Sequence, residues 1–338
     1  MPPPRIDPHQ EPIIATSEHM KCILADIGKV ASSSTSVHLR GETGVGKEVL
    51  AQLIHRMSPR KDAPFIAVNC AAQTETLLES DLFGHERGAY SGAINKRIGL
   101  IERAEGGTLF LDEIGEISPR FQMLLLRVLQ EREFERVGGG QRMRANIRLI
   151  TATNRNLEEA VAQEAFRMDL YYRICVFTVL IPPLRERRED IPPLVELAVR
   201  RSACGPVEFR ISDAVMDMFH SCQWPGNIRE LINCVERSMV LAQGEIVEPR
   251  HIACFNGRCL SKELWGQRGA TKVFADASDD AEKRTTEIQS WSLGERERLV
   301  DALRTANGIK SRAARQLGLT PRQVGYAMRK HGISRCKL

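Results

Sequence analysis

The sequence contains no uninterrupted apolar run that approaches the roughly 20 residues of a membrane-spanning helix. Residues 1–5, Met-Pro-Pro-Pro-Arg, are not followed by the apolar region of a secretory signal peptide. These two absences exclude a membrane protein and predict a cytoplasmic one. Because disulfides are rare in that compartment, the nine cysteines are not expected to form a disulfide framework. A clustered subset of them would instead indicate metal or redox chemistry.

Acidic residues are missing from the C-terminal end, where no Asp or Glu follows Asp301. Residues 292–338 contain eleven Lys and Arg against three Asp and Glu, a net charge of +8, whereas the remaining chain carries −3. Positive charge concentrated in this way is typical of a segment that binds nucleic acid. Double-stranded DNA is therefore a predicted partner, and a solvated basic tail is the alternative.

A glycine-rich stretch, residues 41–48, follows the short apolar segment 37–39 and precedes the helical pattern 49–54. This order of strand, turn and helix is the one in which backbone N–H groups cradle the phosphates of a nucleotide. We expect Lys47 to contact the β and γ phosphates of ATP. Glu48 stands where Ser or Thr usually helps to hold Mg²⁺, so the ion must depend on another carboxylate or on water. A glycine-rich turn without a ligand is the weaker alternative. The predicted loop comprises Gly41, Glu42, Thr43, Gly44, Val45, Gly46, Lys47 and Glu48.

Apolar runs that alternate with helical patterns predict an α/β fold with a parallel sheet covered on both faces. The candidate strands are 65–68, 108–111, 147–152 and 176–181. Pro182-Pro183 ends this pattern, and helical spacing at 191–201, 212–221 and 227–241 predicts a small helical lid. We therefore divide the chain into a disordered, Pro-rich start (1–11), a nucleotide-binding domain (12–253, with the α/β core to about 182 and the lid at 183–253), a Cys-containing linker (254–291) and a DNA-binding domain (292–338).

Two adjacent carboxylates, Asp112 and Glu113, follow the strand 108–111. Ligands of open α/β sheets bind at the carboxyl ends of the strands. We expect Asp112 to hold Mg²⁺ through water and Glu113 to orient and deprotonate the attacking water. Asn154, just after the strand 147–152, is a suitable sensor of the γ-phosphate.

Three arginines complete the predicted ATPase site. Arg167 and Arg173, six residues apart, are candidates for arginine fingers that stabilise the transition state in a neighbouring subunit. Arg229 lies near the start of a lid helix and could reach back to the nucleotide. An isolated arginine is usually a surface residue, so the prediction depends on the order of these residues after the phosphate loop. Fingers that act in a neighbour require a homo-oligomer.

The motifs above resemble the AAA+ ATPases that activate bacterial σ54 RNA polymerase, and the resemblance covers residues 12–253. The decisive segment is 88–93, which reads Gly-Ala-Tyr-Ser-Gly-Ala where the family has Gly-Ala-Phe-Thr-Gly-Ala. In the family this is a surface loop that engages σ54, and an aromatic residue between glycines suits such a contact. Lys47-Glu48 is also the usual pairing of the family. The predicted σ54 contact comprises Gly88, Ala89, Tyr90, Ser91, Gly92 and Ala93.

The resemblance also implies roles for single residues. Asn69 matches the residue that restrains the catalytic Glu113 until the γ-phosphate is sensed. Arg167 and Arg173 match the arginines that act on a neighbour's ATP, and Arg229 matches the second sensor. The family assembles as hexamers, so a hexameric ring is the expected homo-oligomer.

The basic C-terminal segment has the pattern of a helix-turn-helix. Helical spacing at 299–303 and 311–317 is followed by the turn Gly318-Leu319 and a third helix, 320–330, capped by Thr320. The third helix would enter the major groove. The residues expected to face bases are Arg322, Gln323 and Tyr326, and those expected near phosphates are Arg329 and Lys330. A helical protein-interaction module is the alternative. This segment resembles the Fis-type domain that ends many σ54 activators.

Four cysteines, Cys222, Cys234, Cys254 and Cys259, are separated by eleven, nineteen and four residues. They could bind iron or another soft metal, but Cys222 and Cys234 could equally be packed core thiols. The spacing is similar to that of the oxygen-sensitive NifA proteins, activators of nitrogen-fixation genes in rhizobia and their relatives. Those proteins usually also carry an N-terminal GAF domain, so a short variant or a truncated form is expected here.

The predicted function is that of a DNA-bound ATPase which remodels the closed complex of σ54 RNA polymerase at nitrogen-fixation promoters. Three alternatives stay open. The chain could be a DNA-binding regulator switched by nucleotide without remodelling, a σ54 activator of another set of genes, or a different AAA+ remodeller such as a replication initiator.

Overall fold

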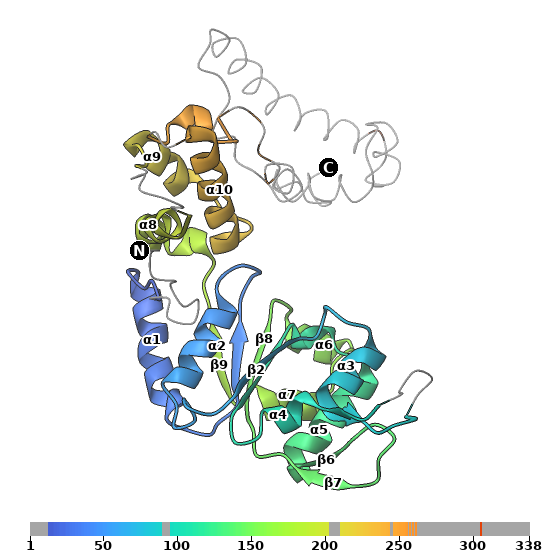
Figure 1. The fold of residues 1–338 in the computed structure, drawn as a ribbon. Helices are drawn as coiled ribbons and strands as arrows, with labels where there is room; N and C mark the ends of the chain where they lie inside the picture. The colour runs from blue at the N-terminus through green and yellow to red at the C-terminus, as the bar shows by residue number, and fades with distance from the viewer. Residues whose placement is uncertain are drawn as a thin grey trace. The chain divides into compact units, whose positions relative to one another are not determined.

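The computed structural model divides the chain into two compact units, Met1–Ala270 and Thr271–Leu338. The first unit contains the nucleotide-binding core and the lid (Figure 1). The predicted helix-turn-helix and Tyr90, Ser91, Gly92 and Ala93 of the predicted σ54 contact lie outside the described residues. The structure describes residues 13–89, 95–202, 210–243 and 246–255, together with 257, 259, 261 and 305.

A five-stranded parallel sheet with the order β2-β5-β8-β1-β9 forms the centre of the nucleotide-binding core. Its strands are β1 (Val37–Arg40), β2 (Phe65–Asn69), β5 (Thr108–Asp112), β8 (Arg148–Thr153) and β9 (Phe177–Leu180). All six residues of β8, the middle strand, are buried, as are the first four of β5. Continuous apolar strands of this kind belong to sheets covered on both faces, so the predicted α/β fold is confirmed.

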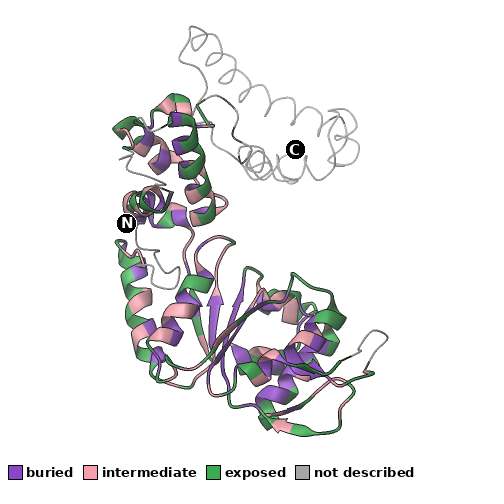
Figure 2. Ribbon diagram, in the orientation of Figure 1, coloured by how far each residue is buried: buried purple, intermediate pink, exposed green. Residues whose placement is uncertain are grey.

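Two hydrophobic clusters cover the two faces of the sheet, because alternate residues of a strand point to opposite sides. Leu109 and Leu111 of β5 join one cluster, and Phe110 between them joins the other. The first cluster is built with helices α3 (Glu75–Phe83), α4 (Leu100–Arg103), α5 (Pro119–Glu131), α6 (Leu157–Ala162) and α7 (Met168–Ile174). The second is built with α1 (Glu18–Ala31) and α2 (Lys47–Arg56). Figure 2 shows the buried residues gathered along the sheet and on the inner sides of the helices.

Two short antiparallel hairpins, which the sequence patterns did not indicate, extend from the core. One pairs β3 (Gly84–His85) with β4 (Arg97–Ile98), and the other pairs β6 (Glu133–Glu135) with β7 (Arg142–Arg144). An isolated bridge joins His85 to Val137, so the two hairpins are neighbours. The first of them flanks the segment predicted to contact σ54.

The predicted lid is helical and has a hydrophobic cluster of its own. Phe219 and Trp224 belong to this cluster, with their rings 5.5 Å apart and edge to face. The lid elements are η3 (Leu184–Glu186), η4 (Arg188–Asp190), α8 (Ile191–Ser202), α9 (Asp213–Ser221), α10 (Asn227–Ala242) and η5 (Pro249–His251).

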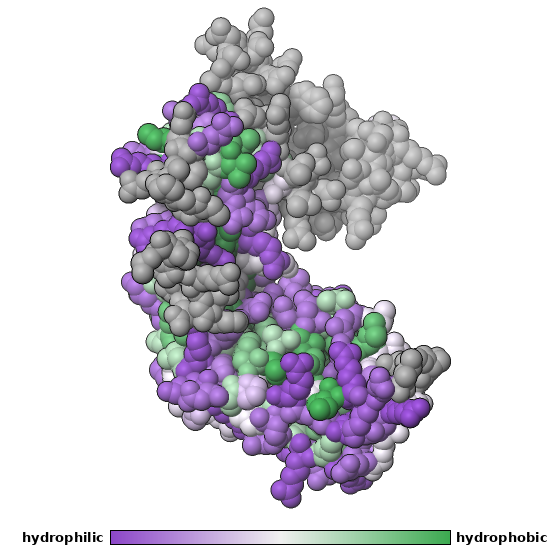
Figure 3. Space-filling view, viewed as in Figure 1, coloured by the Kyte–Doolittle hydropathy of each residue, from purple (hydrophilic) through white to green (hydrophobic). Residues whose placement is uncertain are grey.

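The surface of the described residues is mostly polar on the side drawn in Figure 3. Hydrophilic side chains cover most of the described surface on this face, with smaller apolar areas on the nucleotide-binding core. Of the helices within the described ranges, none combines the length and the apolar character needed to cross a membrane.

Candidate nucleotide site

The predicted phosphate loop connects β1 to α2, as its sequence context indicates. Gly44 has φ = 82° and Gly46 has φ = 101°, backbone conformations that residues with a side chain rarely adopt. Gly46 is the N-cap of α2, so the loop leads its N–H groups into the positive end of a ten-residue helix. Lys47 is only 7% exposed, and its Nζ donates to Gly41 O at 3.0 Å. The loop therefore forms an anion site closed on one side by a lysine.

Asp112 ends β5 and Glu113 directly follows it, before the short helix η2 (Ile114–Glu116). Glu113 Oε1 lies 3.7 Å from Lys47 Nζ, and Asp112 Oδ1 accepts from Glu113 N at 2.9 Å. Burial raises the pKa of the Asp112 carboxyl, although the hydrogen bond from Glu113 N acts against this rise. A bound cation would stabilise the ionised form of Asp112. The structure thus brings the predicted carboxylates to the phosphate loop.

Asn154 follows β8 and reaches the same edge of the sheet. Its Nδ2 donates to Thr43 Oγ1 at 3.1 Å, and its backbone N donates to Glu113 Oε2 at 3.4 Å. Asn69, at the end of β2, pairs in register with Asp112. However, Asn69 Oδ1 accepts from the nearby Ala71 N, and no hydrogen bond joins Asn69 to Glu113 among the described residues. The restraint of Glu113 by Asn69 therefore stays a prediction.

The two candidate arginine fingers have different surroundings. The side chain of Arg167 is 44% exposed and is paired with Asp169, with Nη2 and Oδ2 2.7 Å apart. Arg173 donates instead to the backbone, with its Nη2 2.8 Å from Leu129 O near the end of α5. Arg167 can therefore reach a second molecule without losing core contacts, whereas Arg173 would have to leave a backbone carbonyl.

Arg229, on α10, lies beside the phosphate loop. A Cβ placed on Gly44 would stand 3.2 Å from Arg229 Cβ. Residues of the lid that the sequence patterns did not single out also contact the loop. Arg185 Nη2 pairs with Glu42 Oε1 at 2.6 Å, and Asn227 Nδ2 donates to Glu42 Oε2 at 3.0 Å. The sequence could have indicated the contact of Asn227 with the loop, because Asn227 lies two residues before Arg229 at the helix start.

The start of the predicted σ54 contact, Gly88 and Ala89, follows β3 in the first hairpin and lies next to Gly138 of the second. Arg136, after β6, donates to Glu86 Oε1 at 2.8 Å and to Glu102 Oε2 at 2.6 Å. A Cβ on Gly138 would come within 2.7 Å of Ala89 Cβ, so the backbones approach closely there. The sequence offered one signal for the close approach of Gly138 to Ala89, the run of three glycines at 138–140.

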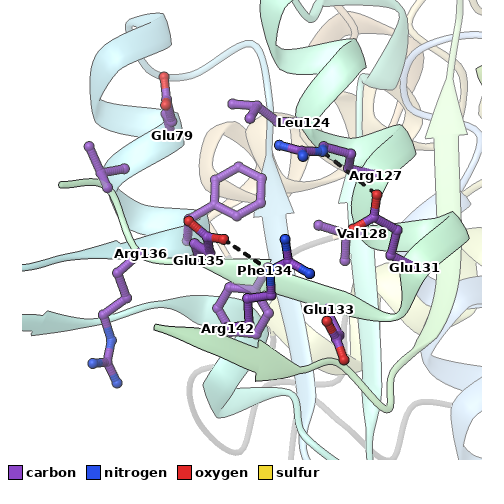
Figure 4. Close-up of a pocket in the computed structure, with 12 residues that line it drawn as sticks. Glu79, Leu124, Arg127, Val128, Glu131, Glu133, Phe134, Glu135, Arg136 and Arg142 are labelled. Carbon is purple, nitrogen blue, oxygen red and sulfur yellow. Dashed lines mark ion pairs between the residues drawn. The ribbon is translucent and has the colours of Figure 1, made fainter. Parts of the chain in front are cut away.

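A cavity of about 190 Å³ lies between α3, α5 and the hairpin of β6 and β7 (Figure 4). Phe83, Leu124, Val128 and Phe134 form its apolar part, and charged residues surround it. Figure 4 shows Arg127 paired with Glu131 and Arg142 paired with Glu135 at this cavity. None of the residues of the phosphate loop lines it. The chemistry predicted from the sequence therefore lies elsewhere, at the carboxyl ends of the strands.

The four spaced cysteines interact electrostatically, with Cys222 and Cys234 in the lid and Cys254 and Cys259 just after it. Burial raises the pKa of the Cys222 thiol to about 11 and that of Cys234 to about 12. Burial and a hydrogen bond with Cys259 raise the pKa of Cys254, and the charges of Cys222 and Cys234 add to the rise. Four thiols are a donor set that soft metals prefer. Within the described part of the chain, however, no group of three or more His, Cys, Asp or Glu is arranged as a metal site. Iron on these cysteines stays a prediction.

Three protein-family models match the chain. The σ54 interaction domain matches residues 13–180 and the AAA+ ATPase lid domain matches residues 185–255. The bacterial regulatory proteins of the Fis family match residues 294–331, within the unit that lies almost wholly outside the described residues. The nucleotide-binding core is thus an AAA+ P-loop domain with a helical lid, as predicted from its motifs.

Two curated relatives decide the family. The chain is 50% identical over 335 residues to the Nif-specific regulatory protein of Herbaspirillum seropedicae, in an alignment that covers 95% of this chain and 62% of that protein. It is 45% identical over 352 residues to the Nif-specific regulatory protein of Rhizobium leguminosarum bv. trifolii, with 99% of both chains covered. The chain belongs to the family of Nif-specific regulatory proteins. It spans about three-fifths of the length of the Herbaspirillum relative.

Solved structures similar to this chain include NtrX from Brucella abortus. The complex of NtrX with ADP has 30% sequence identity and a TM-score of 0.67, covering 95% of this chain and 69% of NtrX. The complex with ATP has 31% identity and the same TM-score, covering 96% and 70%. The resemblance to σ54 activators, and among them to nitrogen-fixation activators, is confirmed.

Proposed function

We propose that this chain hydrolyses ATP to remodel the closed complex of σ54 RNA polymerase at promoters of nitrogen-fixation genes. The observation that carries the proposal is the meeting of Lys47, Asp112, Glu113 and Asn154 at one edge of the sheet. In this proposal the ATPase domain comprises residues 12–253, the linker residues 254–291 and the DNA-binding domain residues 292–338.

Each residue of the site has a role in the proposed hydrolysis. The N–H groups of the loop and Lys47 bind the phosphates, and Asp112 would hold a Mg²⁺ ion, which would neutralise charge on the phosphates. Glu113 accepts the proton of the water that attacks the γ-phosphorus, while the bond to the β-phosphate oxygen breaks and ADP leaves. Asn154 contacts the γ-phosphate and is placed to sense its loss. Arg229 completes the site from the lid.

Hydrolysis by this site involves a second copy of the chain. Arg167 is exposed at the start of α7, and a guanidinium near the γ-phosphate stabilises the transition state. We therefore place Arg167 and Arg173 of one subunit at the ATP of the next, in a ring of six copies. The segment 88–93 of each subunit contacts σ54.

The C-terminal unit anchors the ring to DNA upstream of the promoter. Arg322, Gln323 and Tyr326 read bases in the major groove, and Arg329 and Lys330 contact phosphates. Because the charge of this segment is +8, we expect its DNA affinity to fall steeply with salt concentration.

The test compares ATP hydrolysis with promoter opening on one template that carries a σ54-dependent promoter. Glu113→Gln keeps the shape of the side chain but removes the general base, so hydrolysis should fall about 10²-fold or more while ATP still binds. Open complexes should disappear with it. The matched control is Glu131→Gln, which alters an exposed carboxylate at the end of α5. If Glu113→Gln still opens the promoter with ATP bound, the chain is a nucleotide switch and not a remodelling ATPase.

The cysteines provide the proposed redox control through iron. Cys222 and Cys234 lie in the lid that carries Arg229, so the state of the thiols would affect the ATP site. Protein purified without oxygen should contain stoichiometric iron, and Cys254→Ser should lose both the iron and activation. Cys22→Ser, which alters an exposed cysteine on α1, is the control. Wild-type protein that is free of iron, with an ATPase stable in air, would leave the cysteines as packing residues.

A further inference from the structure

Three successive carbonyl groups of the phosphate loop accept hydrogen bonds from the lid. Thr43 O accepts from Asn227 Nδ2 at 3.1 Å, Gly44 O from Ile228 N at 3.0 Å, and Val45 O from Arg187 Nη2 at 2.8 Å. The partners of Val45 and Thr43 are separated from them by 142 and 184 residues of sequence, so the contact exists only in the folded chain. We call these three bonds the lid seam.

The lid seam determines which way the N–H groups of the loop point. A peptide bond is planar and trans, so the carbonyl of one residue and the N–H of the next point in opposite directions. Holding the carbonyls of residues 43, 44 and 45 toward the lid turns the N–H groups of residues 44, 45 and 46 away from it. Successive N–H groups turned to one side form the nest that binds an anion. The lid therefore acts on the same peptide groups that bind phosphate.

The lid residues that make these bonds are rigidly held. Asn227 is fully buried, and its Oδ1 accepts from Leu184 N at 2.8 Å, which leaves Nδ2 directed at the loop. Arg187 is 2% exposed, and burial lowers the pKa of its guanidinium. A Cβ on Gly44 would meet Gly226 O at 2.3 Å, so the two backbones are in direct contact. Such close packing leaves the loop little freedom while the lid is docked.

Two lid residues, Arg185 and Asn227, compensate the charge of the loop. Glu42 carries a carboxylate next to a site for anionic phosphates. Arg185 binds both of its oxygens, at 2.9 and 2.6 Å, and Asn227 Nδ2 adds a third bond at 3.0 Å. A bidentate guanidinium compensates the charge of a carboxylate and fixes its direction. The carboxylate of Glu42 is therefore bound by the lid, and its negative charge is compensated there.

We propose that Asn227 and Arg187 are positioning residues that orient the phosphate-binding N–H groups of the loop. The inference rests on the ATP site proposed above, but it concerns binding and not hydrolysis. Docking of the lid and binding of the β-phosphate become a single coupled equilibrium, so each favours the other by the same factor. The lid is thus a part of the phosphate site, in addition to carrying Arg229.

The test uses Asn227→Asp in the full chain, because Asp keeps the acceptor for Leu184 N and loses the donor to Thr43 O. Dissociation constants of ADP and AMP are measured by calorimetry, and their ratio reports the β-phosphate alone. We expect the preference for ADP over AMP to fall about tenfold, equivalent to about 1.4 kcal/mol. Arg187→Met removes the donor to Val45 O without adding charge, and should reduce the same ratio. Val240→Ala, at a 75% exposed position on α10, is the matched control and should leave it unchanged.

Repulsion between Glu42 and the carboxylate introduced by Asn227→Asp is tested by adding Glu42→Gln. The reduced preference should persist in this double variant, because Thr43 O still lacks its donor. An unchanged ratio in folded Arg187→Met protein, or full recovery in the double variant, would overturn the inference. If the wild type binds ADP normally but hydrolyses no ATP, the proposed function fails and the role of the lid seam stands.

Discussion

A buried histidine next to the phosphate loop makes the stability of the core depend on pH. His38 lies on β1, is 2% exposed, and its Nδ1 is 2.9 Å from Thr151 Oγ1. Burial lowers the pKa of His38 from 6.5 to about 4, while the charge of Glu158 raises it and those of Arg40 and Lys47 lower it further. The imidazole is therefore neutral in the folded protein at physiological pH.

The sign of the effect follows from proton binding. Between pH 6.5 and pH 4 the unfolded chain binds a proton at His38 that the folded chain does not, so stability is fully present above pH 6.5 and is lost as the pH falls. The lowered pKa corresponds to a loss of about 2 kcal/mol at pH 5 and about 3 kcal/mol near pH 4.

The contribution of His38 to the pH dependence of stability is measured by urea unfolding of the wild type and of His38→Gln. Unfolding is followed by circular dichroism at pH 7 and pH 5. Other groups titrate alike in both proteins, so the comparison concerns the change with pH and not the absolute stability. We expect the wild type to lose about 2 kcal/mol more than the variant between the two pH values. Equal losses, within about 0.5 kcal/mol, would refute the assignment of a buried neutral imidazole.

Three further substitutions test other parts of the molecule. Arg167→Ala should reduce ATP hydrolysis about 10³-fold at unchanged ADP affinity. Mixing this variant with Lys47→Ala subunits should restore part of the phosphate release, because an intact Arg167 then meets an intact phosphate loop in the neighbouring subunit. No recovery on mixing would contradict the action of Arg167 in a neighbour. Gly44→Ala places a Cβ 2.3 Å from Gly226 O at φ = 82°, so ADP affinity measured by calorimetry should fall at least about tenfold; normal affinity would show that the contact is not needed. Leu231→Ala removes a fully buried side chain of the lid. The free energy of unfolding, measured by urea denaturation, should fall by about 2–5 kcal/mol, and a loss below about 1 kcal/mol would contradict the core position of Leu231.

Much of the core could be predicted from the sequence because its signals are local. The glycines of residues 41–48 stand between a strand and a helix, and the apolar run 108–111 leads directly to Asp112 and Glu113. Parallel strands place their carboxyl ends at one edge of the sheet, so this order along the chain already implied that the loop and the carboxylates meet. The spacing of the four cysteines left a metal site and packed thiols equally open, and within the described residues no group of three or more His, Cys, Asp or Glu could hold a metal ion.

Other features depended on contacts between distant segments, which no local pattern encodes. In the sequence Asn227 and Arg187 are ordinary polar residues of the lid. In the folded chain they donate hydrogen bonds to the carbonyls of Thr43 and Val45. Arg173 resembled Arg167 in sequence, yet Arg173 is held by the carbonyl of Leu129 whereas Arg167 pairs with an exposed carboxylate. The sequence by itself determined which chemical groups the proposed ATP site contains, because short motifs specify strand ends and turns. Only the tertiary structure decided which way those groups face, because orientation depends on the partners that burial brings into contact.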